Sequence, residues 1–176
     1  MRAEFVLKQI AADDIEQLSC LAVEAFREDS YFREAFKADD LDSTLYDIFK
    51  QCASICLECG KVVGAFESAT NTMVGFALMF DFNNVREKHP QYYKKIFPEA
   101  LGLNKLSAKV EQIVGKYSEY LYILALGVSP SWRKRGICSL MIEGIKQSYV
   151  QYNFIADISN EAMYDILCSK FGFESV

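Results

Sequence analysis

The feature that most constrains the fold is a nearly continuous apolar run, EYLYILALGV, at residues 119–128. A strand with one face in water alternates apolar and polar side chains, whereas a strand covered on both faces is apolar throughout. Pro130 ends the run, and the spacing of Ile137, Met141 and Ile145 predicts an amphipathic helix soon after it. We therefore expect this strand to lie inside a sheet that carries helices on both faces.

The rest of the chain supplies the other elements of such a sheet. Alternating or β-branched stretches predict strands at 4–10, 61–67, 73–81 and 152–157, with FGFESV at 171–176 beginning another. Apolar residues at helical spacing predict helices at about 14–26, 42–59, 137–149 and 160–171. The stretch 26–40 is typical of a loop with a short helix, and 83–118 of a polar, helix-like insert.

This order predicts an α/β (α+β) fold. Its core is a mixed, mostly antiparallel central sheet flanked by helices, with a helical insert at about 83–118 and a short C-terminus. A length of 176 residues is enough for one domain and rarely enough for two, so residues 1–176 are expected to form a single domain.

Composition and charge narrow the classes of partner and compartment. The formal charge of −5 argues against nucleic acid as the main partner, because phosphate backbones attract a basic face. No run of about 18 apolar residues is present to span a membrane, and the N-terminus does not resemble a signal peptide. We therefore expect a cytoplasmic protein without nucleic-acid or membrane partners, whose six cysteines are reduced thiols.

Three of these cysteines, Cys52, Cys56 and Cys59, have the C-x-x-x-C-x-x-C spacing with which radical-SAM enzymes hold an iron–sulfur cluster. Such enzymes need most of a large α/β barrel, for which 176 residues do not suffice. The same cysteines recur at helical spacing with Leu45 and Phe49, and a reduced cysteine packs as a small hydrophobe. The pattern favours the core face of an amphipathic helix, and no metal is expected.

The segment that carries chemistry follows the central strand, where a tight turn opens directly into a helix. The first N–H groups of a helix have no partner inside it, and the helix dipole adds partial positive charge there, so an anion is stabilised at that end. Gly136 allows the backbone to approach the anion closely. Arg133, Lys134 and Arg135 add positive charge, and Ser139 offers a hydroxyl. The ligand implied is a pyrophosphate.

At these residues the sequence resembles the GNAT superfamily of acyl-CoA-dependent N-acyltransferases. The family signature is Arg/Gln-x-x-Gly-x-Gly/Ala after an apolar strand that ends in Val-x-Pro. Here Val-Ser-Pro at 128–130 precedes Arg-Lys-Arg-Gly-Ile-Cys at 133–138. Downstream, Asn160, Leu167-Cys168 and Phe-Gly-Phe at 171–173 follow the order of a second family segment. Two segments in register on the expected elements are more specific than one glycine motif.

The resemblance implies acetyl-CoA as a co-substrate, bound by the strand, the turn and the start of the helix. In this family the strand splays from its neighbour, so its backbone groups bind the pantetheine arm and the acetyl carbonyl. The residues implied to bind acetyl-CoA are Leu126, Val128, Arg133, Lys134, Arg135, Gly136, Ile137, Cys138, Ser139 and Asn160.

The implied mechanism is direct transfer. A neutral amine attacks the thioester, a backbone N–H near Val128 meets the oxyanion, and the thiolate takes a proton as it leaves. Cys168 stands where the family has the tyrosine that acts as the general acid, and Tyr164 lies one helical turn earlier on the same face. Tyr122 holds the position of the family's carboxylate or histidine, which makes these three residues the catalytic candidates. Other candidate bases remain open: Glu67, Asp81, His89 and Glu119.

The sequence thus predicts an N-acetyltransferase that moves an acetyl group from acetyl-CoA to a primary amine on a small molecule or a peptide. The alternative is a non-catalytic acyl-CoA-binding protein of the same fold, because the usual acid and an obvious base are missing. The oligomeric state stays open, with a homodimer as one alternative. Four acidic residues hint at a cationic acceptor, although a solvated acidic face explains them better: Glu28, Asp29, Asp39 and Asp40.

Overall fold

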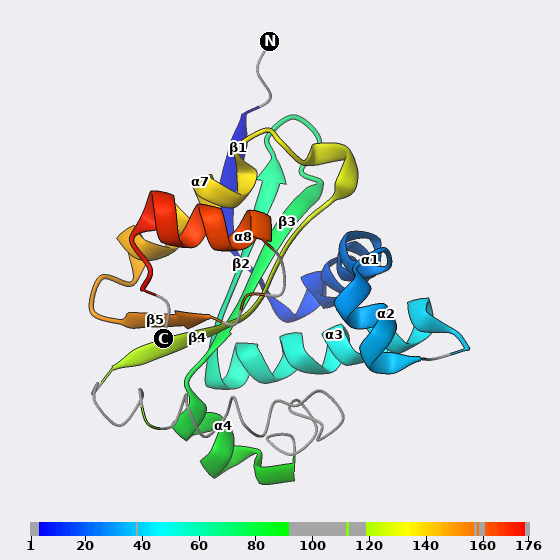
Figure 1. Cartoon of the computed structure of the whole chain (residues 1–176), viewed down its shortest axis with the longest axis horizontal. Helices are drawn as coiled ribbons and strands as arrows, with labels where there is room; N and C mark the ends of the chain where they lie inside the picture. The colour runs from blue at the N-terminus through cyan, green and yellow to red at the C-terminus, as the bar shows by residue number, and fades with distance from the viewer. Residues whose placement is uncertain are drawn as a thin grey trace.

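The computed structural model describes residues 4–37, 39–91, 112, 119–156, 158 and 161–174. Five strands form one sheet in the order β1-β2-β3-β4-β5 (Figure 1). The first four strands pair antiparallel, and β5 pairs parallel with β4, which confirms the expected mixed, mostly antiparallel sheet. The strands are β1 Phe5–Gln9, β2 Gly60–Glu67, β3 Met73–Phe80, β4 Tyr120–Val128 and β5 Asn153–Ala156.

Helices connect the strands and cover the sheet. The α-helices are α1 Ile15–Phe26, α2 Ser30–Phe36, α3 Leu41–Cys59, α4 Phe82–Lys88, α7 Ile137–Ser148 and α8 Glu161–Tyr164. The 3-10 turns η1 Ala12–Asp14 and η3 Pro130–Trp132 precede α1 and α7, and the π-helix η4 Asp165–Lys170 continues α8. The predicted helices and the short helix α2 are present. Of the predicted insert, α4 is its beginning, and 92–111 and 113–118 lie outside the described residues.

Aspartate side chains cap the N-termini of three of these helices. The carboxylates of Asp29, Asp40 and Asp81 accept hydrogen bonds from backbone N–H groups in the first turns of α2, α3 and α4. Each bond satisfies a donor that the helix itself leaves unpaired. Two of the acidic residues that hinted at a cationic acceptor, Asp29 and Asp40, therefore have a structural role.

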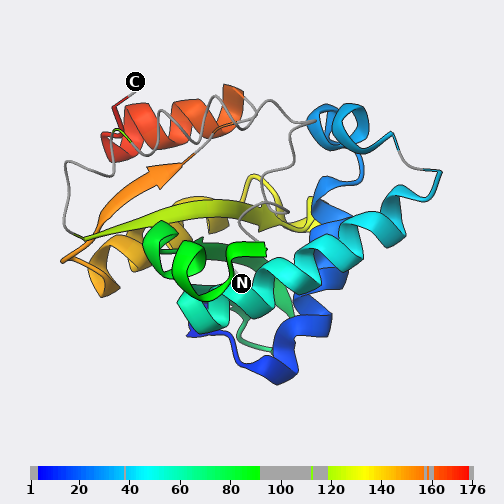
Figure 2. The same cartoon turned by 90° about the horizontal axis from the view of Figure 1, so that it is seen from below.

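The helices pack on both faces of the sheet, as the buried strand predicted (Figures 1 and 2). On one face, Leu18 of α1 and Phe49 of α3 pack with Phe76 of β3. On the other face, Met141 of α7 packs with Val74 of β3. β3 lies between the two layers and is buried along its whole length.

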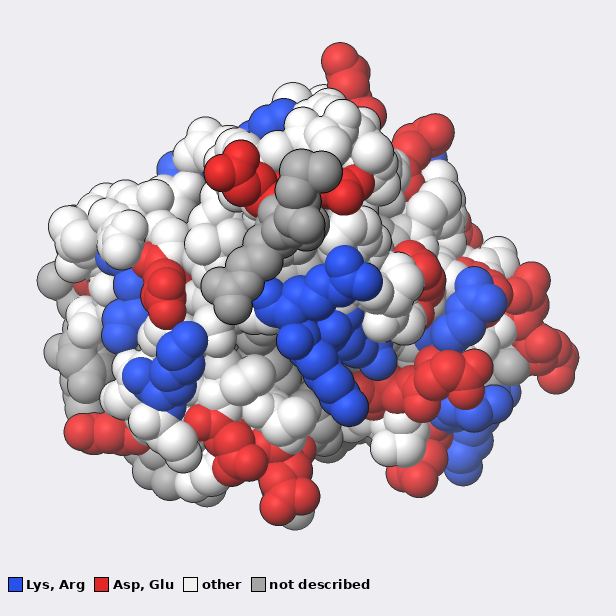
Figure 3. Space-filling view, turned by 90° about the horizontal axis from the view of Figure 1, so that it is seen from above, with Lys and Arg blue, Asp and Glu red and all other residues white. Residues whose placement is uncertain are grey.

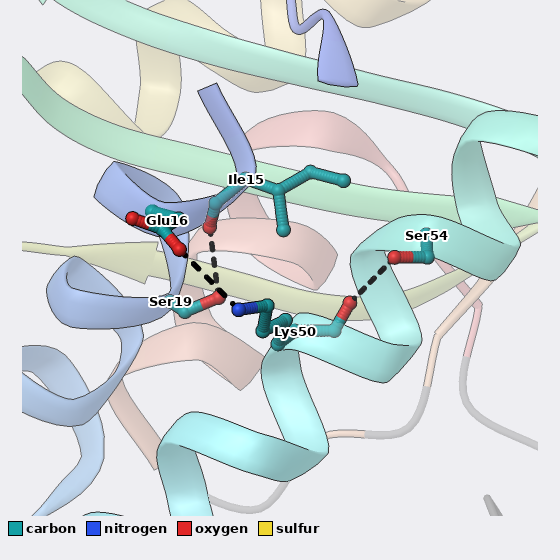
Figure 4. Close-up of polar contacts among 5 residues, drawn as sticks. All are labelled: Ile15, Glu16, Ser19, Lys50 and Ser54. Carbon is teal, nitrogen blue, oxygen red and sulfur yellow. Dashed lines mark hydrogen bonds and ion pairs between the residues drawn. The ribbon is translucent and has the colours of Figure 1, made fainter. Parts of the chain in front are cut away.

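α1 and α3 also meet at the surface (Figure 4). Lys50 Nζ of α3 lies 3.4 Å from Glu16 Oε1 of α1, and this hydrogen bond raises the pKa of Lys50. Ser19 and Ser54 donate to backbone carbonyls one turn earlier in their own helices. An exposed ion pair adds little stability, so the apolar side chains beneath it hold the two helices together.

The cysteines of α3 belong to this core. Cys52, Cys56 and Cys59 are buried, and burial raises the pKa of Cys52 to about 12 and that of Cys56 well above its ordinary value. Burial therefore disfavours the thiolate that a metal requires. Their interpretation as core residues is confirmed. Within the described ranges, no group of three His, Cys, Asp or Glu side chains is arranged to hold a metal ion.

β4 contains a one-residue bulge. Leu78 of β3 pairs with Ala125, but the next residue, Met79, pairs with Ile123, so Leu124 is an extra residue on β4. Side chains alternate between the two faces of a sheet, so an extra residue reverses the faces that the later side chains occupy.

The packing shows this reversal. Before the bulge, the Tyr122 side chain belongs to the core between the sheet and the α1–α3 layer. After it, Leu126 and Val128 pack on the opposite face with α7, although all three residues have even numbers. The bulge therefore turns the side chains of Leu126 and Val128 toward α7.

Among the described residues, the pairing of β4 with β5 ends close to the bulge. The last pair between them is Ile123 with Ala156, one residue before Leu124. On the other side, β4 stays paired with β3 as far as Val128 and Gly75. Among the described residues, 124–128 therefore have a strand partner on one side only. The splay that the family resemblance implied stays a prediction, because residue 157, the next one along β5, lies outside the described residues.

The described end of the chain differs from the expected strand at 171–176. Gly172 has a φ of 71°, and Phe173 N donates to the carbonyl of Leu167 at 3.0 Å, which closes the end of η4. The Phe173 ring packs with the core beneath α7. Residues 172–174 therefore form a helix ending and no strand, and 175–176 lie outside the described residues.

Candidate active site

The turn between β4 and α7 has the backbone of an anion site. Lys134 and Gly136 have positive φ values of 62° and 81°, and Gly136 is the N-cap of α7. The Leu140 N–H donates to the Gly136 carbonyl at 2.9 Å and makes the first helical bond. The N–H groups before Leu140 have no partner inside the helix, and the helix dipole makes this end positive. An anion placed against them is stabilised.

Cationic side chains surround this end of α7. Lys134 and Arg135 are exposed. The Arg135 guanidinium lies 4.5 Å from the centre of the Trp132 ring. The Trp132 ring forms a T-shaped pair with Phe5 at a centroid distance of 5.7 Å. Figure 3 looks down on the end of the molecule where the turn lies and shows a compact group of Lys and Arg side chains between acidic groups. The stacking holds the Arg135 charge near the turn.

Arg133 differs from its two basic neighbours, because its guanidinium donates to backbone carbonyls. Its Nη2 donates to the carbonyl of Ala25 in α1 at 2.7 Å, and its Nε donates to the carbonyl of Val128 at 3.3 Å. A direct contact of Arg133 with the pyrophosphate stays a prediction.

Ser129 makes a second connection between the turn and α1. Its hydroxyl is buried, donates to Glu24 Oε1 at 3.2 Å, and lies 3.0 Å from the Ser131 hydroxyl. Sequence reasoning did not identify Glu24, and no local pattern could have revealed it, because its partner is 105 residues away.

Cys138 occupies the place of the glycine or alanine in the family signature, and its side chain packs against α8. Its Sγ lies 3.6 Å from Met163 Sδ. Burial raises the pKa of Cys138 to about 11, so the thiol stays protonated at neutral pH. The Cys138 side chain thus lies between α7 and α8, while its N–H remains in the first turn of α7.

The remaining residues predicted to bind acetyl-CoA lie along the same segment. Leu126 and Val128 pack with Ile137 beneath the start of α7, so their side chains position the helix. Ser139 is half-buried in the first turn of α7. Asn160 lies outside the described residues.

The three catalytic candidates lie on two faces of the sheet. Tyr122 is buried in the α1–α3 layer, with its ring centre 5.3 Å from that of Phe80. Tyr164 is 44% exposed, and Cys168 is half-buried within the π-helix η4. This C-terminal segment packs on α7, where Lys146 Nζ donates to the Phe171 carbonyl at 3.0 Å. The structure therefore groups Tyr164 with Cys168 and places Tyr122 across the sheet from them.

The other candidate bases take part in local structure. Asp81 caps α4, and Glu67 Oε2 accepts from the Thr70 hydroxyl at 2.6 Å in the β2–β3 turn. His89 Nε2 lies 2.8 Å from Glu58 Oε2 at the end of α4. Figure 1 shows α4 at the opposite end of the sheet from α7 and the yellow turn before it. Glu119 is exposed beside the start of β4, and its carbonyl accepts from Asn153 N.

Comparisons with known proteins identify the fold. No protein-family model matches the sequence, and no curated protein matches it. Several solved structures match with TM-scores between 0.63 and 0.69. The polyamine N-acetyltransferase of Drosophila melanogaster has a TM-score of 0.68 at 12% identity, over 94% of this chain and 81% of that one. Arylalkylamine N-acetyltransferase 2 from Aedes aegypti has a TM-score of 0.68 at 15% identity, over 96% and 82%.

A third match is the C-terminal condensation domain of Ebony, solved with beta-alanyl-dopamine. Its TM-score is 0.69 at 11% identity, over 98% of this chain and 83% of that domain. The chain therefore has the fold of the GNAT acetyltransferases, as the sequence resemblance implied. In the described part of the chain, no helix is both long and apolar enough to cross a membrane.

Proposed function

We propose that this protein is an N-acetyltransferase that moves an acetyl group from acetyl-CoA to a primary amine by direct transfer. The observation that supports the proposal most strongly is that β4 runs directly into the turn before α7, where the first N–H groups of the helix have no partner inside it. One continuous segment can thus hold a pyrophosphate at its end and an extended thioester arm along β4. The fold shared with N-acetyltransferases supports the same proposal.

Backbone groups carry most of the donor site. The N–H groups of Ile137, Cys138 and Ser139 hold the pyrophosphate together with the side chains of Lys134 and Arg135. The backbone of residues 124–128 binds the amides of the pantetheine arm as a neighbouring strand would. One N–H of this edge meets the oxyanion that develops when the amine attacks.

Proton transfer uses side chains from both faces of the sheet. Cys168 on η4 protonates the departing thiolate, and Tyr164 is a second donor that acts through a water molecule. Tyr122 lies across the sheet and two residues before Leu124, where its hydroxyl takes up the proton of the attacking amine and passes its own proton to water. The acid and the relay are thereby separated by the strand that holds the thioester.

A second candidate function is a non-catalytic acyl-CoA-binding protein. Two observations favour it: a cysteine stands in the place of the usual tyrosine acid, and the buried Tyr122 stands in the place of the usual carboxylate or histidine. The donor site is the same in both functions, so only turnover separates them.

The test is an assay with acetyl-CoA and a panel of primary amines, followed by mass spectrometry of the products. The starting panel consists of polyamines, agmatine and arylalkylamines, because N-acetyltransferases named for these amines share the fold. Peptides with free amines are added to the panel. An N-acetylated amine formed in equal amount with free CoA supports the transferase. Binding of CoA without product from any amine favours the non-catalytic function, and absence of CoA binding contradicts both.

A further inference from the structure

Arg133 joins the turn to an element from the other end of the chain. Ala25, whose carbonyl accepts from Arg133 Nη2 at 2.7 Å, lies in the last turn of α1. The last carbonyls of a helix have no partner inside it and form the negative end of its dipole. A guanidinium is therefore well matched to this position, because it donates charged hydrogen bonds in a rigid plane.

The second bond of Arg133 returns to its own segment. Its Nε donates at 3.3 Å to the carbonyl of Val128, the last residue of β4. The Ser129–Glu24 hydrogen bond lies beside it and connects the same two elements. Two successive residues of α1, Glu24 and Ala25, are thus bonded to the turn. Arg135 provides the contrast, because its guanidinium donates at 3.4 Å to Ser131 within the turn and stacks on Trp132.

We infer that Arg133 is a positioning residue that couples the turn before α7 to the last turn of α1. The bonds to Ala25 and Val128 hold the turn in the conformation that presents the first N–H groups of α7, with positive φ at Lys134 and Gly136. A ligand that orders the turn therefore also orders the end of α1, and the coupling is reciprocal. This inference rests on the proposed function in that CoA is the ligand of the turn.

Hydrogen exchange with and without CoA tests the coupling. In the wild type, CoA slows exchange of backbone amides both in the first turn of α7 and in the last turn of α1. In Arg133→Ala, protection remains at α7 and is lost at α1, and the Kd for CoA rises about tenfold. Arg33→Ala is the matched control, because Arg33 forms an exposed surface pair with Glu28, and it leaves both regions protected.

Salt dependence separates positioning from a direct charge contact. If Arg133 positions the turn, the slope of log Kd against log salt concentration is the same in Arg133→Ala as in the wild type, whereas Lys134→Ala flattens it. Arg133→Lys keeps the charge but lacks the planar fork, so it also loses protection at α1, and it replaces the alanine variant if that variant fails to fold.

Two results would overturn the inference and leave the proposed function standing. In the first, CoA still protects α1 in both Arg133 variants. In the second, Arg133→Ala flattens the salt dependence of Kd as Lys134→Ala does. If CoA binds the wild type and protects α7 but not α1, the coupling is likewise absent while the proposed function stands. If CoA does not bind the wild type, the proposed function fails together with the inference.

Discussion

Substitution of Gly136 tests the anion site, because one replacement can strain the backbone and another can add a negative charge, so the two effects can be separated. Gly136 has a φ of 81°, and an added Cβ would meet no atom within 4 Å. Gly136→Ala therefore costs stability through the backbone alone, about 1–2 kcal/mol. For a chain of this length, 1 kcal/mol lowers Tm by roughly 2–4 °C. Gly172→Ala is the matched control, with a φ of 71° and the same open space, but it lies beyond η4.

Gly136→Asp adds a negative charge where the pyrophosphate is expected. Repulsion between two unit charges about 4 Å apart is roughly 1 kcal/mol in water and roughly 4 kcal/mol at an effective dielectric constant near 20. We therefore expect the Kd for CoA to rise by roughly 5-fold to 10³-fold. Aspartate is a favourable N-cap, so this variant should be no less stable without ligand than Gly136→Ala. Gly136→Asn has the same shape without the charge and should bind CoA more tightly than Gly136→Asp.

Calorimetric titration measures Kd, and thermal unfolding measures Tm with and without CoA. At a CoA concentration of about 100 times Kd, the wild type gains about 2.7 kcal/mol of stability, which raises its Tm. Gly136→Asp at the same concentration should gain much less. Equal affinity of the aspartate and asparagine variants would refute an anion site at this end of α7. Equal loss of affinity in Gly136→Ala and Gly172→Ala would show that the effect is general destabilisation.

The remaining predictions concern proton transfer and the buried thiols. Cys168→Ala should lower turnover by about 10²-fold with nearly unchanged CoA affinity, and Tyr164→Phe should cost less; equal turnover of these variants and the wild type would contradict a donor on this helix. The free energy of unfolding, measured with urea, should fall as pH rises from about 9 to about 12. The reason is that Cys138 and Cys52 keep their protons in the folded chain up to pKa values of about 11 and about 12, above the ordinary value of 9.0. A constant stability over this range would contradict the raised pKa values. Iodoacetamide should modify the exposed Cys20 before the buried Cys52 and Cys56, and early modification of either buried cysteine would contradict their burial.

Local patterns predicted much of the fold, including the segment that we propose to bind the donor. The strand at 120–128, the turn and α7 follow from an apolar run, a proline and an amphipathic spacing within about 30 residues. The burial of the α3 cysteines could also be predicted, because the helical spacing of apolar residues shows which face of a helix is buried. The strand expected at the end of the chain was not found in the described residues, because Gly172 and the bond from Phe173 to Leu167 close the helix instead.

Contacts between distant segments could not be predicted. The bulge at Leu124 depends on how β3 pairs with β4, and it places Tyr122 and Val128 on opposite faces although an even spacing separates them. The basic residues of the turn look alike in the sequence. Only the fold distinguishes Arg133, whose partner Ala25 is 108 residues away, from Arg135, whose partner Ser131 is four residues away.

A calorimetric titration of the wild type with CoA and, separately, with pantetheine, which lacks the pyrophosphate, tests whether the turn before α7 binds a pyrophosphate. We predict that one CoA binds per chain, that pantetheine binds much more weakly, and that added salt weakens the binding of CoA but not that of pantetheine. No binding of CoA at millimolar concentration, or equal affinity for CoA and pantetheine, would contradict a pyrophosphate site at the start of α7.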